Sequence, residues 1–79
     1  MNKEEILNKL QDIFRDVFDD DTIVIREDSD ADDIDEWDSF NNISLMSAIE
    51  KSFNIKFDLA ELQDLEDVGA MADVILKKL

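Results

Sequence analysis

The chain has 79 residues and a formal net charge of −14, and it contains no cysteine, histidine or proline. Its length predicts a single domain spanning residues 1–79, and its 44% of hydrophobic residues can form a compact core. The missing residue types exclude disulfides, zinc–thiolate sites and histidine-based catalysis, so we expect a protein that is not an enzyme. The negative charge disfavours nucleic acid and anionic lipid as partners and favours basic protein surfaces.

Localisation is also constrained by the pattern of apolar residues. No apolar run approaches the roughly 20 residues of a membrane-spanning helix, and no signal peptide precedes the first charged segment. We therefore expect a cytoplasmic monomer without a membrane span.

The N-terminal segment predicts an amphipathic helix. Asn2 is a suitable N-cap, Glu4 and Glu5 favour the first turn, and the run Asp19-Asp20-Asp21 ends the helix. Its apolar residues recur with helical spacing and form one stripe: Ile6, Leu7, Leu10, Ile13, Phe14, Val17 and Phe18.

A long acidic connection follows, from residue 19 to residue 38. It holds eleven of the twenty-two acidic residues and one base, Arg26. The run Thr22-Ile23-Val24-Ile25 is β-branched, but no second strand is evident, so we expect an extended loop that pins apolar side chains onto the helices. Connections of this length are often functional.

The second helix is predicted to begin near Asp38-Ser39 and to run to about Phe53. On a helical wheel its apolar residues fill a sector of about 160°: Ile43, Leu45, Met46, Ile49 and Phe53. Phe40 falls outside that sector, so the core does not require it. Asn54-Ile55-Lys56-Phe57 then ends the helix and supplies two more apolar anchors.

Two further helices complete an all-α fold. The run Asp58-Leu59-Ala60-Glu61 has the form of a capping box and predicts a short helix, about Leu59 to Gln63. A last helix follows Asp64 to Asp67, with the apolar positions Val68, Met71, Ala72, Ile75 and Leu79. Gly69 leaves room there for close packing. The expected architecture is a four-helix bundle with three longer helices, one short helix and a long first loop.

One serine is distinguished by its position. Ser39 follows Asp38 at the predicted start of the second helix, directly after the acidic loop. A helix N-terminus presents free backbone N–H groups and the positive end of the helix dipole, which together stabilise a phosphate group. On position alone, the favoured interpretation is that Asp38 or Ser39 is simply an N-cap, because that is the commonest use of these residues.

The segment Asp38-Ser39-Phe40 and the helix that it opens resemble the acyl carrier protein family, whose second helix opens with an Asp-Ser-Leu motif. Glu50, Phe53, Ile55 and Phe57 also match the family pattern at the end of that helix and in the following turn. The resemblance covers nearly the whole chain, through its length, helix order, long first loop and acidity.

The resemblance implies that Ser39 carries a covalent 4′-phosphopantetheine arm, delivered from coenzyme A by a phosphopantetheinyl transferase. The arm's terminal thiol would hold an acyl group as a thioester, for partner enzymes of fatty acid, polyketide or surface-polysaccharide biosynthesis. Asp38 and Phe40 would lie beside the arm. Acyl-transferring or acyl-activating enzymes with basic docking patches would contact Asp38, Phe40, Asn41, Ser44 and Glu50.

Four positions depart from the family pattern. Glu36 stands where a glycine is usual, Phe40 replaces leucine, and Asn41 and Ser44 stand at positions that are commonly acidic. The version Glu36-Trp37-Asp38-Ser39-Phe40 resembles specialised stand-alone carriers rather than the carrier of housekeeping fatty acid synthesis. Trp37 is either a core anchor for the loop or an aromatic contact of the arm.

Two alternatives lack a prosthetic group. Asp28, Asp30 and Asp32 have the 1-3-5 spacing of a calcium-binding EF-hand loop, but Asp33 and Ser39 occupy the positions that require glycine and glutamate. At best this gives a weak acidic cation site, and we expect no dedicated metal site. The other alternative is an acidic helical adaptor, which fits the charge equally well but does not explain Asp38-Ser39 at a helix start.

Overall fold

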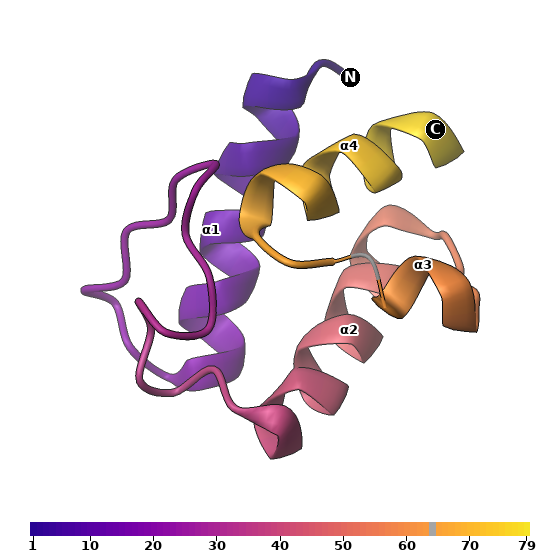
Figure 1. Cartoon of the computed structure of the whole chain (residues 1–79). Helices are drawn as coiled ribbons and strands as arrows, with labels where there is room; N and C mark the ends of the chain where they lie inside the picture. Colours follow the sequence, from indigo (N-terminus) through magenta and orange to yellow (C-terminus); the bar gives the residue numbers. More distant parts are fainter. Residues whose placement is uncertain (64) are drawn as a thin grey trace.

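The structure is a computed structural model, and it describes residues 1–63 and 65–79. Within these residues it contains four helices and no strand: α1 (Lys3–Phe18), α2 (Ser39–Phe53), α3 (Leu59–Gln63) and α4 (Val68–Lys78). Figure 1 shows α1 packed between the long loop on one side and the remaining helices on the other. The predicted all-α fold and the order of its helices are confirmed. None of the described helices has the length and apolar character needed to cross a membrane.

Local capping signals set the helix boundaries. Asn2 and Glu5 form a reciprocal capping box at the start of α1, and Asp19 ends that helix in the left-handed conformation. A second reciprocal pair joins the backbone and side chains of Asp58 and Glu61 at the start of α3. Asp67 caps α4 by accepting a hydrogen bond from the Ala70 N–H at 2.7 Å. Asp64, which the sequence placed before this last helix, lies outside the described residues.

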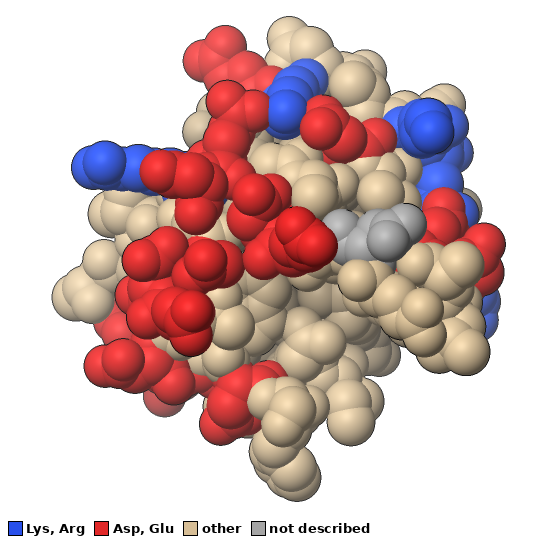
Figure 2. Space-filling view, in the orientation of Figure 1, with Lys and Arg blue, Asp and Glu red and all other residues tan. Residues whose placement is uncertain are grey.

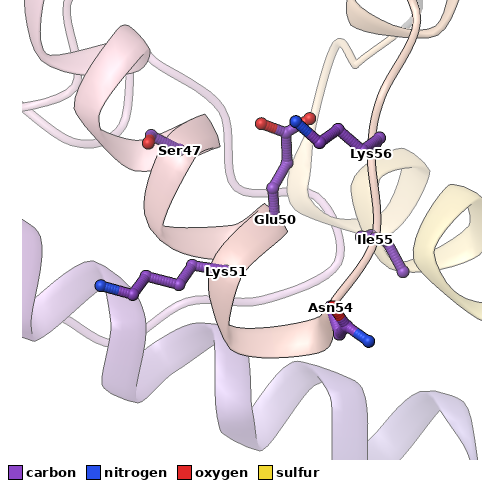
Figure 3. Close-up of a pocket in the computed structure, with 6 residues that line it drawn as sticks. All are labelled: Ser47, Glu50, Lys51, Asn54, Ile55 and Lys56. Carbon is purple, nitrogen blue, oxygen red and sulfur yellow. The ribbon is translucent and has the colours of Figure 1, made fainter.

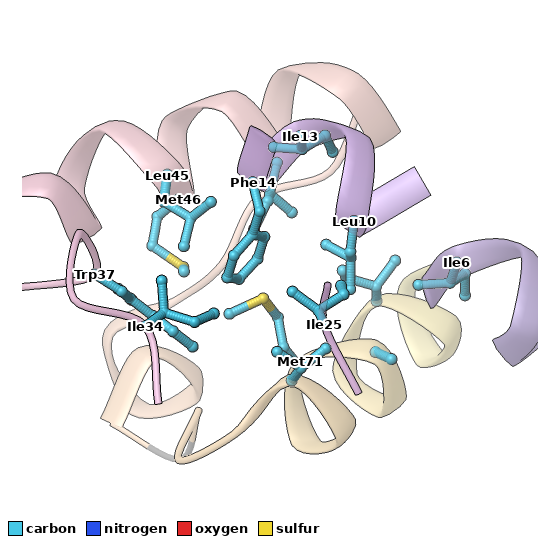
Figure 4. Close-up of a cluster of buried hydrophobic side chains, with 14 of the residues drawn as sticks. Ile6, Leu10, Ile13, Phe14, Ile25, Ile34, Trp37, Leu45, Met46 and Met71 are labelled. Atoms are coloured by element: carbon cyan, nitrogen blue, oxygen red, sulfur yellow. The ribbon is translucent and has the colours of Figure 1, made fainter. Parts of the chain in front are cut away.

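The core lies where α1 packs against α2 and α4. Phe14 is fully buried at its centre, and its ring makes edge-on contacts with Phe18 and Trp37. Figure 4 shows Phe14 among the buried side chains. The second helix contributes Leu45, Met46, Ile49 and Phe53, and α4 contributes Val68, Met71, Ala72 and Ile75. The predicted place on a core-facing stripe is wrong for two residues, because Ile43 is 72% exposed and Leu79 is also exposed. Ile43 lies at the edge of its wheel sector, beyond the strip that α1 covers.

The acidic loop is held against the bundle rather than free in solvent. Ile23, Ile25 and Ile34 are buried, whereas Val24 between them is exposed, so the predicted extended segment does pin apolar side chains. The loop also reaches α4, because the N–H groups of Val68 and Gly69 donate to the carbonyls of Ser29 and Glu27 at 2.9 and 2.7 Å. These bonds satisfy backbone donors of the first turn of α4, which have no partner inside the helix.

One side chain reinforces the contact between the loop and α4. Lys3 of α1 forms ion pairs with Glu27 of the loop at 2.6 Å and with Asp73 of α4 at 2.9 Å. Hydrogen bonding to these two carboxylates raises the pKa of Lys3. The loop therefore has a fixed course over α1 and α4, and it enters α2 from a defined direction.

Candidate functional site

Ser39 is the first residue of α2 and is exposed. The residue before it, Asp38, is the N-cap, and its carboxylate accepts a hydrogen bond from the Asn41 N–H at 2.7 Å. The capping role that the sequence left open between the two residues thus falls to Asp38. The Ser39 hydroxyl is left at the surface of a helix N-terminus, where it can accept a bulky substituent.

A cleft with a volume of about 210 Å³ opens beside Ser39. Its walls come from the loop, from the start of α2 and from the segment before α4, namely Ala31, Trp37, Asp38, Ser39, Asn42, Leu65 and Glu66. Within a helix the N–H groups of the first residues have no partner, so those of Ser39 and Phe40 suit a phosphate attached at this point. The cleft offers a partly apolar surface on which an extended group attached to Ser39 could rest. The residues present therefore fit a phosphopantetheine arm.

Of the two descriptions that the sequence left open for Trp37, the structure supports the core anchor. Its side chain is only 6% exposed and its ring contacts Phe14 at a centroid distance of 5.1 Å, so it is a core anchor. It also lines the cleft next to Ser39.

Four of the five predicted docking residues lie together. Asp38, Phe40, Asn41 and Ser44 occupy the cap and the first two turns of α2, and the Phe40 side chain is 81% exposed. Asn41 is partly engaged, because its side-chain amide donates to the Glu36 carbonyl at 2.8 Å.

Glu50 is separated from this group. It lies eleven residues beyond Ser39, about 16 Å along the helix axis, beside a second cleft of about 390 Å³. Figure 3 shows its side chain extending from α2 toward the connecting segment that carries Ile55 and Lys56. There its carboxylate accepts a hydrogen bond from the Phe57 N–H at 2.8 Å, which fixes the connection between α2 and α3.

A further exposed apolar side chain, Ile43, lies beside the predicted docking group. Ile43 and Phe40 are three residues apart on one face of α2, and both are largely exposed. Figure 2 shows uncharged surface over the lower end of α2, in contrast to the acidic surface over the loop. The sequence did contain a signal for this patch, since Ile43 lies on the side of the wheel sector that faces Phe40.

The acidic loop holds half of the acidic residues, and acidic side chains cover it on the face that Figure 2 shows. Asp30 organises a turn in it, because its carboxylate accepts hydrogen bonds from the N–H groups of Asp32 and Asp33 at 3.0 and 3.2 Å. Within residues 1–63 and 65–79, no three acidic side chains converge in a way that could hold a metal ion. The geometry therefore does not support a cation site at Asp28, Asp30 and Asp32.

Two carboxyls meet where the loop approaches α2. Hydrogen bonding to Asp20 raises the pKa of Glu36, while hydrogen bonds from Thr22 are the main cause that lowers the pKa of Asp20. Both residues are partly exposed, and their contributions to stability have opposite dependence on pH. The Glu36 contribution is lost as the pH rises through its raised pKa, and the Asp20 contribution is lost as the pH falls through its lowered pKa.

Added salt is expected to raise the melting temperature. A charge of −14 on a small bundle produces self-repulsion, which is strongest at low ionic strength and neutral pH. Thermal melts in sodium chloride, magnesium chloride and calcium chloride at equal ionic strength should all show the increase. The triple variant Asp28→Asn, Asp32→Asn, Asp35→Asn should melt higher than wild type at low salt and respond less to added salt. A stoichiometric response to micromolar calcium, without one to magnesium, would contradict a purely screening effect and indicate a calcium site.

Comparison with known proteins places the chain in a family. A family model described as "Phosphopantetheine attachment site" matches residues 8–75. Among solved structures, the chain is similar to the solution NMR structure of a holo acyl carrier protein from Geobacter metallireducens. The two share 49% identity with a TM-score of 0.86, over 91% of this chain and 83% of the other. No curated protein matched the chain.

Proposed function

We propose that Ser39 is the residue to which a 4′-phosphopantetheine arm is attached, because the chain belongs to the acyl carrier protein family. Members of this family are carriers rather than enzymes, and they hold 4′-phosphopantetheine covalently. The observation that supports this most strongly is the division of roles at the start of α2. Asp38 caps the helix, and Ser39 presents its hydroxyl beside a cleft.

The attachment is a group transfer from coenzyme A. The Ser39 oxygen forms a bond to the phosphorus nearest pantetheine, the pyrophosphate linkage breaks, and the nucleotide portion of coenzyme A leaves. The hydroxyl proton is lost to the transferase. The arm supplies a thiol that this chain lacks, since it has no cysteine. Partner enzymes provide the catalysis of acyl transfer.

Ser39→Ala is expected to fold normally but to accept no arm. Asp38 supplies the cap, so removal of the serine hydroxyl should change the free energy of unfolding by less than the ~1–2 kcal/mol of a lost N-cap. Intact mass spectrometry after incubation with coenzyme A and a broad-specificity transferase provides the measurement. Ser47→Ala, which alters another exposed serine of α2 outside the proposed docking surface, should still gain one arm. Modification of the Ser39→Ala variant would refute the assignment.

We propose that partner enzymes dock at the first two turns of α2, on Asp38, Phe40, Asn41 and Ser44, with Ile43 completing the contact. The exposed Phe40 and Ile43 side chains would pack against apolar side chains of the partner. The neighbouring acidic loop would attract Lys and Arg side chains on the adjacent surface of the partner. This attraction would speed association at low ionic strength. Glu50 would contribute only to a partner that extends along the whole of α2.

Phe40→Ala tests this surface. Because Phe40 is 81% exposed, we expect the variant to lose far less stability than the ~3–5 kcal/mol of a buried phenylalanine. Its rate of arm transfer or of partner turnover should nevertheless fall. Denaturant melts and transfer kinetics supply the two readouts. Leu79→Ala removes an exposed apolar side chain at the C-terminus and should change neither. A large stability loss with unchanged kinetics would show that Phe40 is not a docking residue.

The pathway is proposed from residues near Ser39. Glu36-Trp37 before the Asp38-Ser39 pair, together with Phe40 after it, favours a specialised stand-alone carrier, for polyketide or surface-polysaccharide enzymes, over a carrier for housekeeping fatty acid synthesis. Loading assays with purified acyl-activating and fatty acid synthase enzymes would distinguish these alternatives. Faster loading by the fatty acid synthase enzymes would contradict the proposal.

A further inference from the structure

Trp37 combines a buried ring with a polar tip that reaches the first turns of α2. Its ring packs edge-on against Phe14 in the core, at an interplanar angle of 88°. Its indole N–H donates a hydrogen bond to the Asn42 side-chain oxygen at 2.8 Å. Asn42 is the fourth residue of α2, so this bond joins the residue two places before Ser39 to the helix that follows it.

Asn42 occupies a position where the helix pattern calls for an apolar residue. At 100° per residue it lies about 60° from Leu45 on the wheel, between Ile49 at about 40° and Phe53 at about 80°. Leu45, Ile49 and Phe53 are all buried core residues. Asparagine is also a poor helix former, since its side chain competes for backbone hydrogen bonds. The Asn42 side chain is only half-buried, and the indole N–H is the partner that the structure gives it.

A second bond runs parallel to the first. The Asn41 side chain donates to the Glu36 carbonyl at 2.8 Å, and the Asn41 N–H donates to the Asp38 carboxylate at 2.7 Å. Two consecutive asparagines of α2 thus hold the three residues that precede Ser39. Through the Trp37 ring, this junction is anchored to α1 and the core.

From this geometry we propose that Trp37 and Asn42 act as a positioning pair for arm transfer, in which the indole–amide hydrogen bond holds the Asp38–Ser39 junction in the place that a transferase requires. The inference rests on the proposed role of Ser39. Packing alone would not require the indole N–H, because a phenylalanine ring could fill much of the same space. Group transfer is sensitive to placement, and a displacement of about 1 Å can cost as much as 10²-fold in rate.

The test removes the hydrogen bond while retaining the ring. Trp37→Phe deletes the donor and Asn42→Ala deletes the acceptor, whereas Asn42→Asp retains an acceptor of the same shape. A distal core variant, Ile75→Val, controls for a general loss of stability. Each protein is incubated with coenzyme A and a phosphopantetheinyl transferase, and kcat and KM are measured for the carrier. In wild type and the Asn42 variants, the single indole N–H resonance reports the hydrogen bond through its shift and exchange rate.

We expect Trp37→Phe and Asn42→Ala each to lower kcat by roughly tenfold, with KM little changed because the docking surface remains. The double variant should be no worse than either single variant, since both remove the same bond. Asn42→Asp should restore most of kcat, and Ile75→Val should match wild type. The indole N–H of Asn42→Ala should exchange faster than that of wild type.

Two results would overturn the inference while leaving the role of Ser39 intact. One is a kcat for Trp37→Phe and Asn42→Ala equal to that of Ile75→Val, which would assign the pair to packing alone. The other is additive losses in the double variant, which would show that the two side chains act independently. If wild type accepts no arm at all, the proposed attachment site fails, and the positioning role fails with it.

Discussion

Phe14→Ala is expected to destabilise the fold by about 3–5 kcal/mol, the cost of truncating a fully buried phenylalanine. Phe14 has no exposed surface, and its ring lies against Phe18 and Trp37 at centroid distances of 5.7 and 5.1 Å. Domains of this size are stable by only about 0.05–0.15 kcal/mol per residue. The loss is thus a large share of the total, and a substantial unfolded population is expected at 37 °C. Urea denaturation followed by circular dichroism measures it.

Phe40→Ala is the matched control, because it makes the same substitution on an exposed ring. The difference in the free energy of unfolding between the two variants isolates the effect of burial from the effect of residue type. Phe14→Ala should also alter the fluorescence of the only tryptophan, since it removes a ring that contacts Trp37. Equal stability losses in the two variants would contradict a core centred on Phe14.

Gly69→Ala is expected to destabilise the protein by about 2 kcal/mol, although alanine is the better helix former by about 1 kcal/mol. A Cβ atom at this position would lie 2.8 Å from the Glu27 carbonyl oxygen, which also accepts the Gly69 N–H. Relieving this clash means moving the loop backbone, at a cost of about 1–3 kcal/mol for overpacking and about 1 kcal/mol for the hydrogen bond.

The control for Gly69→Ala is Ser47→Ala, on the exposed face of α2. At this exposed position alanine raises the helix propensity without a steric clash, so the free energy of unfolding should stay the same or rise. In hydrogen exchange, Gly69→Ala should lose protection at Val68 and at residue 69, whose N–H groups bond to the loop. A stabilised Gly69→Ala variant would show that the loop is not fixed to α4 as described.

The helices could be predicted closely because their signals are local. A capping residue precedes each helix and can be recognised by its spacing from the residue whose N–H it binds. The four caps are Asn2, Asp38, Asp58 and Asp67. The exposure of Phe40 followed from the helical wheel. Ile43 was misassigned because a wheel gives directions but does not show how wide a strip the neighbouring helix covers.

The features that sequence reasoning missed depend on contacts between distant residues. Nothing local predicts that Ser29 and Glu27 accept hydrogen bonds from α4, apart from the single glycine that leaves space for them. Glu50 was predicted as a docking residue, but its carboxylate accepts a hydrogen bond from the backbone N–H of Phe57. Asn42 did carry a signal, as a polar residue on the apolar face of α2, and only the fold shows that Trp37 is its partner.

Localisation of the added mass tests the central assignment most directly. Cleavage after Arg26 and Lys51 gives a peptide of residues 27–51 that contains four of the five serines, Ser29, Ser39, Ser44 and Ser47. After incubation of the full chain with coenzyme A and a transferase, fragmentation of this peptide should place one phosphopantetheinyl group between Asp38 and Phe40. A group located on Ser29, Ser44 or Ser47, or a wild-type chain that remains unmodified while a known carrier is modified alongside it, would contradict attachment at Ser39.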